Sequence, residues 1–152
     1  MKTSAAKYAG DRPAAIVVIV ALVLIQTYRV AALGVAQDAL TASGSPAWFF
    51  PGLADFAFGM TAPFVGLLLY QLAGLGVWVG GLVWLSLSLF DFIDGFATNL
   101  AVGPPPGLGA SPSDAAVVLL IWIAIDVVAI ALLCRPIVRA YFVRSSQAVD
   151  SA

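Results

Sequence analysis

The 152-residue chain contains no histidine and no glutamate, and Cys134 is its only cysteine. Haem held by two histidines, histidine-bound zinc, thiolate clusters and Ser-His or Cys-His catalysis therefore lack their usual side chains. A single cysteine also cannot form a disulfide within the chain. We therefore predict no cofactor and no metal site, and the sequence disfavours redox and hydrolytic chemistry.

Charged residues are scarce as well. They make up 10% of the chain, whereas an ordinary soluble domain has about 25%. Because 62% of the residues are apolar, a chain folded in water would expose large apolar patches. The formal net charge is −1, and no basic patch outside the tails suggests a nucleic-acid partner. These numbers predict an integral membrane protein whose first partner is the lipid bilayer.

Four apolar runs are long enough to cross a bilayer, which takes about 20 helical residues. We predict an all-α fold, a single-domain integral membrane four-helix bundle with antiparallel helices. The predicted spans are about 13–36, 53–71, 77–100 and 115–134. The segments 37–52 and 101–114 are the predicted external loops.

The connections between these runs carry their own signals. Three consecutive prolines at 104–106 cannot continue a helix. The short link 72–76 predicts a tight helical hairpin. Ser113 and Asp114 offer N-cap chemistry to the fourth span. The aromatic run 48–50 is typical of a belt at the membrane surface.

The basic residues predict the orientation. Six of the seven lie in the tails: Lys2, Lys7 and Arg12 before the first span, and Arg135, Arg139 and Arg144 after the fourth. Because basic residues favour the cytoplasmic side, we expect both termini in the cytoplasm and the protein in the plasma (inner) membrane. An alternative is that the first apolar run is a cleavable signal peptide, which would leave three spans.

Five charged residues fall inside predicted spans: Arg29, Asp55, Asp91, Asp94 and Asp126. A charge at the bilayer centre costs at least about 2.5–3.5 kcal/mol. The helical rise places the first four roughly 5–13 Å below the outer ends of their spans, and Asp126 about 18 Å below. Pairing explains the shared depth, because arginine binds a carboxylate in bidentate geometry and can recruit a second.

One arginine cannot neutralise every carboxylate. At least one aspartate must be protonated, reach water, or bind a cation or cationic ligand. Asp91 and Asp94 are three residues apart and share a helix face with Trp84 and Ser88. The predicted binding site comprises Arg29, Asp55, Asp91, Asp94, Ser88 and Trp84, with Asp126 as a deeper polar site. The alternative is that these residues only lock the helices together.

Glycines recur at regular spacing in the middle of the chain. Gly52, Gly59 and Gly66 are seven residues apart in the second span, and Gly76 and Gly80 are four apart in the third. Both patterns let helix backbones approach closely in a membrane. We therefore predict that both sets of glycines pack against other helices.

The second and third spans also carry two short motifs. Their residues are Gly52, Asp55, Gly59, Ala62, Pro63, Trp84 and Asp91. They resemble motifs of an uncharacterised family of small prokaryotic four-helix integral membrane proteins, in which Asn and Gly would stand at Leu85 and Ser88. The resemblance implies the same four-helix fold. It also groups Asp55 and Asp91 with Trp84. Because the family is uncharacterised, the resemblance does not indicate which activity the protein has.

Two functions fit these features. The first is a binding or transport module, of a proton, a cation or a small polar ligand, built on the Asp/Arg cluster and completed by a homo-oligomer. The second is an accessory or assembly subunit of a larger membrane complex, with no activity of its own. An enzyme is a third alternative, because Asp91 and Asp94 form an Asp-x-x-Asp pair that could hold magnesium.

Overall fold

The computed structural model describes residues 12–41, 44–107 and 109–150. In these ranges every element is a helix and no strand is present, so the predicted all-α fold is confirmed. Four helices of the described chain are long and apolar enough to cross a membrane: Ala14–Ala39, Pro46–Gln71, Leu75–Val102 and Pro112–Leu133.

The first of these long helices changes its winding in the middle. It consists of α1 (Ala14–Leu24), the 3₁₀ helix η2 (Ile25–Ala31) and α2 (Ala32–Ala39). A 3₁₀ turn, η3 (Pro46–Trp48), leads into α3 (Phe49–Gln71). The remaining elements are α4 (Leu75–Val102), α5 (Pro112–Leu133) and α6 (Pro136–Asp150).

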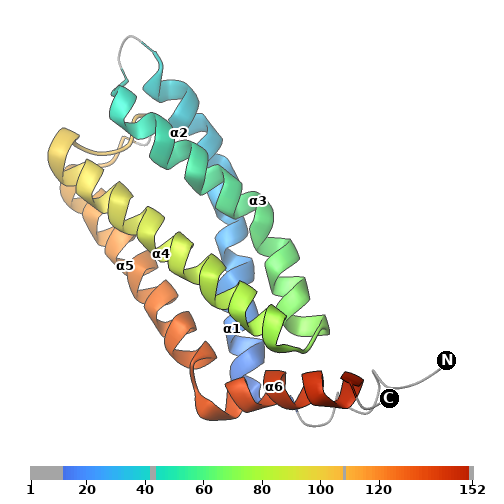
Figure 1. Ribbon diagram of the computed structural model, residues 1–152. Helices are drawn as coiled ribbons and strands as arrows, with labels where there is room; N and C mark the ends of the chain where they lie inside the picture. Colours follow the sequence, from blue (N-terminus) through green and yellow to red (C-terminus); the bar gives the residue numbers. More distant parts are fainter. Residues whose placement is uncertain (1–11, 42–43, 108, 151–152) are drawn as a thin grey trace.

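The four long helices form a closed ring. The first long helix packs against α3 on one side and α5 on the other, and α4 completes the ring by packing against α3 and α5. The end of α2 and the starts of η3 and α5 lie at one end, while the start of α1, the α3–α4 turn and α6 lie at the other (Figure 1). In the half of the bundle nearer α6 the interior is apolar, with Ile19, Leu69, Leu85 and Leu133 fully or nearly fully buried.

The helices extend further than the predicted spans, so both connecting loops are shorter than expected. Proline explains the early starts, since its fixed φ suits the first helical turn. Pro46 opens η3, and Pro112 opens α5 behind Ser111, whose hydroxyl accepts a 3.2 Å hydrogen bond from the Asp114 backbone. Ser111 is therefore the N-cap in place of Ser113 or Asp114.

Helix α6 was not predicted, because polar residues interrupt its sequence and leave no long apolar run. Val138 and Phe142 are completely buried and join the apolar core. Arg139 lies over the ring of Trp78 at 5.6 Å, and the Trp78 indole donates a 2.9 Å hydrogen bond to the Leu133 carbonyl. The helix thus runs across the end of the ring of helices (Figure 1).

The glycines of the second span pack against another helix as predicted, whereas the pair in the third span contacts no other helix of the described chain. A Cβ on Gly59 would overlap the backbone of Arg29 and Val30, and one on Gly52 would lie 2.8 Å from the Ala36 nitrogen. These glycines therefore let α3 approach the first long helix. Gly76 and Gly80 are exposed, and a Cβ there would meet nothing within 4 Å.

Candidate functional site

The centre of the site is the guanidinium of Arg29, whose side chain is completely buried. Its Nε donates to Asp55 of α3 and its Nη2 donates to Asp91 of α4, and both contacts are ion pairs. The predicted pairing of this arginine with the two carboxylates is therefore present in the structure. Charged hydrogen bonds of this kind are the strong ones, and these two tie three of the long helices together.

A second group of hydrogen bonds extends from Arg29 toward the middle of the bundle. Its Nη1 donates to Gln26 Oε1 at 2.8 Å and to Ser88 Oγ at 2.6 Å. Gln26 in turn donates a 2.7 Å hydrogen bond to Asp126 Oδ1, and the Ser88 hydroxyl lies 2.8 Å from Asp126 Oδ2. Asp126 belongs to α5, so the network joins all four long helices.

Aromatic rings enclose the arginine on its remaining sides. The guanidinium carbon lies 4.1 Å from the centroid of the Phe92 ring and 4.8 Å from that of Phe58. Rings at these distances attract the cation through their quadrupoles. The arginine is thus held by its hydrogen bonds and its aromatic neighbours, away from water.

The local winding of the first long helix explains how Gln26 and Arg29 reach the same place. Both belong to η2, and a 3₁₀ helix has three residues per turn, so side chains three positions apart lie directly above one another. Both are buried. Gly59 completes the arrangement, because only a residue without a Cβ lets α3 lie against the backbone at Arg29.

A cavity of about 330 Å³ lies beside this network, between the network and the loop end of the bundle. Its walls come from every long helix and from the loop at 103–111. Most of the lining is apolar or aromatic, and the ring-bearing residues are Tyr28, Trp48, Pro51, Phe92, Pro105 and Trp122. Trp122 stacks on Tyr28 with a centroid distance of 4.5 Å.

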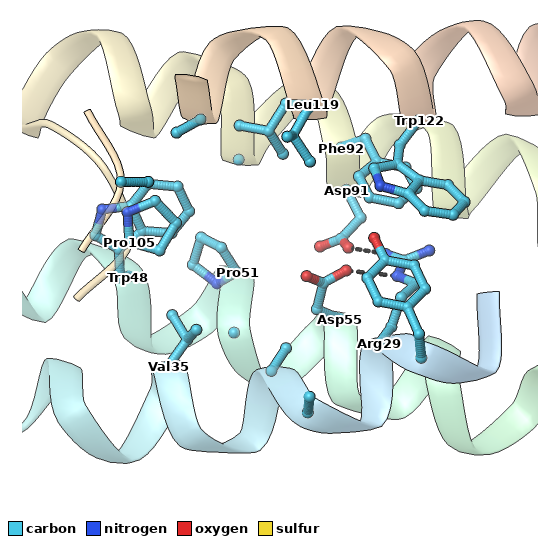
Figure 2. Close-up of a pocket in the computed structure, with 18 of the residues that line it drawn as sticks. Arg29, Val35, Trp48, Pro51, Asp55, Asp91, Phe92, Pro105, Leu119 and Trp122 are labelled. Carbon is cyan, nitrogen blue, oxygen red and sulfur yellow. Dashed lines mark hydrogen bonds and ion pairs between the residues drawn. The ribbon is translucent and has the colours of Figure 1, made fainter. Parts of the chain in front are cut away.

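The two carboxylates that bind Arg29 also form the polar end of the cavity. Figure 2 shows Asp55 and Asp91 side by side, between Arg29 and the open space, with Trp48 and Pro105 at the far end. Each uses one oxygen for Arg29, and the other oxygens point into the cavity (Figure 2). The Asp55 side chain is 30% exposed and that of Asp91 is 9% exposed.

The predicted site residues separate into two groups. Arg29, Asp55, Asp91 and Ser88 come together as predicted, and the deeper Asp126 is part of the same network. Two residues lie outside it. Trp84 donates a 3.0 Å hydrogen bond to Thr61 and packs edge-on against Phe58, and Asp94 is exposed.

Sequence reasoning missed Gln26 and the role of Trp48. Gln26 is a polar residue inside an apolar run, three positions before Arg29, and this spacing was the available signal. Trp48 is only 3% exposed, and its indole donates a 3.1 Å hydrogen bond to the Gly103 carbonyl. It is therefore a wall of the cavity and not part of a surface belt.

Within the described ranges, no three His, Cys, Asp or Glu side chains are grouped so that they could hold a metal ion. Comparison of the chain with protein-family models, curated proteins and solved structures finds no match.

Proposed function

We propose that the protein is an antiparallel four-helix bundle of the plasma membrane with both termini in the cytoplasm. The distribution of basic residues supports this orientation. Arg12 lies 4.2 Å from the Tyr70 ring at the end of α3, and Arg139 lies over Trp78 at the start of α4. Both are at the end of the bundle opposite the cavity. The segments 37–51 and 101–113, at the cavity end, contain no Lys or Arg.

In this orientation the cavity lies in the outer half of the membrane, and we propose that it binds a small cation or polar ligand. One observation carries the proposal. A single carboxylate would neutralise Arg29, yet two carboxylates contact it, and both present an oxygen to the same cavity. The second carboxylate, at the end of an otherwise apolar space, is where a cationic or polar ligand would be held.

The interior supports binding more strongly than transport. On the cytoplasmic side of Asp126, the core consists of apolar side chains such as Leu85, Ala129 and Leu133. Phe142 of α6 is part of the same core. A ligand would have to separate these packed residues to cross. We therefore propose that the protein is a binding module. Transport across the membrane would require the bundle to open.

A second candidate function is that of an accessory or assembly subunit. The observation in its favour is the pair of exposed glycines, Gly76 and Gly80, on a helix of the described bundle. Small residues four positions apart favour close helix–helix contact in a membrane. A second copy of the chain or another membrane subunit could pack there.

The binding proposal is tested by the thermal stability of the purified protein in lipid nanodiscs. The solutes would be sodium, potassium, magnesium and a panel of small amines, alcohols and carboxylic acids, since a ligand at 100 times its Kd stabilises by about 2.7 kcal/mol. We expect at least one cation or polar solute to raise the melting temperature. Asp91→Asn should remove the effect and Asp94→Asn, on the same helix but exposed, should keep it.

The proposal is wrong if no solute stabilises the protein, or if Asp91→Asn responds as the parent does. Either result would assign the carboxylates to locking the helices. The accessory-subunit candidate would then be examined by purifying the protein under mild conditions. Co-purification of foreign chains that is lost in Gly80→Leu would support it.

A further inference from the structure

The ionisable side chains that a ligand would meet in the cavity are mainly carboxylates. The lining contains three carboxylates, Asp55, Asp91 and Asp114, and one cation, Arg29. The arginine is completely buried, donates to four side chains, and lies behind the carboxylates when viewed from the cavity (Figure 2). Ionised carboxylate oxygens would therefore repel an anion that entered the cavity. They would attract a cation, and the mostly apolar lining would strengthen this attraction.

The lining is unsuited to an inorganic cation. Calcium takes about 6–8 oxygen ligands, and magnesium keeps several waters. At the polar end of the cavity the carboxylates are those of Asp55 and Asp91, Tyr28 adds one phenolic oxygen to the lining, and the neighbouring walls are Pro51, Phe92 and Trp122. A bare ion would lose its hydration shell against aromatic carbon. A cation that carries its own apolar surface avoids this loss.

The shape of the cavity matches such a molecule. Its volume of about 330 Å³ is at the small end of the 300–1,000 Å³ typical of small-molecule sites. Trp122 stacks on Tyr28 and lies nearly parallel to Phe92, so three aromatic rings lie together at one wall of the cavity. Trp48 and Pro105 close the far end (Figure 2).

Hydrogen bonding selects the type of cation further. The oxygens of Asp55 and Asp91 that do not bind Arg29 point into the cavity (Figure 2) and can accept hydrogen bonds. A primary ammonium carries three N–H donors and can bridge both carboxylates, whereas a quaternary ammonium has none. The position of the two aspartates thus favours a ligand with N–H bonds at its charged end.

We propose that the ligand is a protonated primary or secondary organic amine, an inference that rests on the proposed function. Its ammonium group lies between Asp55 and Asp91, and its apolar body extends between Trp122 and Trp48. Asp114, exposed at the mouth of the cavity, adds negative charge along the entrance without contacting the bound ammonium. The reaction is reversible binding, with no covalent step.

The test compares three probes of nearly equal size that differ in charge: benzylamine, benzyl alcohol and benzoate. Binding to the protein in nanodiscs is measured at pH 7 by calorimetry, with empty nanodiscs subtracted, and by tryptophan fluorescence. We expect benzylamine to bind at least tenfold more tightly than benzyl alcohol, and benzoate not to bind. Asp91→Asn should weaken benzylamine binding at least tenfold, and Asp114→Asn by less than threefold.

A steric variant tests the location of the apolar body. Gly95 lines the cavity, and a Cβ there would lie 3.5 Å from Leu119 and 3.9 Å from the Trp48 ring, with no backbone of another helix within 4 Å, so Gly95→Leu adds side-chain volume beside the cavity. Gly80→Leu is the matched control, because its side chain meets open space. We expect Gly95→Leu to lose benzylamine binding and Gly80→Leu to keep it.

The outcomes separate this proposal from the broader one. Equal affinity for benzyl alcohol, or unchanged benzylamine binding in both Asp91→Asn and Gly95→Leu, overturns the amine ligand. So does the absence of benzylamine binding. If sodium, an alcohol or an acid then stabilises the parent through Asp91, the cavity is still a binding site and only the ligand class is wrong. If no solute does, both proposals fail.

Discussion

The side-chain amide of Gln26 donates a 2.7 Å hydrogen bond to Asp126, a carboxylate 100 residues further along the chain. Both side chains are completely buried. The bond joins the 3₁₀ segment η2 to α5 in the middle of the bundle. Through Arg29 and Ser88, the same network continues to Asp55 and Asp91 at the cavity.

Replacing Gln26 by leucine should destabilise the protein by about 1–3 kcal/mol, because buried partners would lose their hydrogen bonds. Asp126 would lose a donor and Arg29 an acceptor. The matched control is Gln71→Leu, at an exposed position at the end of α3. Chemical unfolding in detergent micelles measures both variants, and equal stability would show that the Gln26–Asp126 bond contributes nothing.

Replacing Arg29 by alanine should be more severe, with a loss of about 3–5 kcal/mol, because carboxylates would be left buried without their cation. Arg135→Ala removes the same charge at an exposed position and should change stability little. The two melting temperatures are compared in the same nanodiscs. If the Arg29 variant melts within a degree or two of the Arg135 variant, the ion pairs do not hold the helices together.

The variant Gly59→Ala should destabilise the protein, because the added methyl group would force α3 away from the first long helix. The added carbon would overlap the backbone at Arg29 and Val30, where neither helix can yield without moving. Overpacking of this kind costs about 1–3 kcal/mol. In contrast, Gly80→Ala should be neutral or stabilising by up to about 1 kcal/mol, since alanine favours the helix and meets open space. Thermal unfolding that ranks the two variants in the opposite order would contradict this packing.

The proposed orientation predicts the reactivity of cysteines at the two ends of the bundle. The native Cys134 is exposed near α6 and should react with an impermeant maleimide only after the cells are permeabilised. Ser113→Cys in a Cys134→Ala background places a thiol near the cavity mouth, at an exposed position. It should react in intact cells. Labelling of Cys134 in intact cells would show that the orientation is the opposite of the proposed one.

Parts of the site were predictable because depth in a membrane follows from chain position. Arg29, Asp55 and Asp91 fall at similar depths along their spans, and the cost of an unpaired buried charge makes their pairing the expected outcome. The same reasoning could not separate Asp91 from Asp94. Residues three apart on a helix share a face only approximately, and the rotation of α4 brings Asp91 to Arg29 and leaves Asp94 exposed.

The sequence by itself determined the helical class of this protein, the number of long apolar helices and the set of charged residues that lie within them. These properties depend on composition and on the length of apolar runs, which are local and additive. Only the tertiary structure decided that Gln26 joins the network, that α6 docks through Phe142, and that Trp48 closes a cavity. Each of these depends on how helices distant in sequence are rotated and packed against one another, which no single segment specifies.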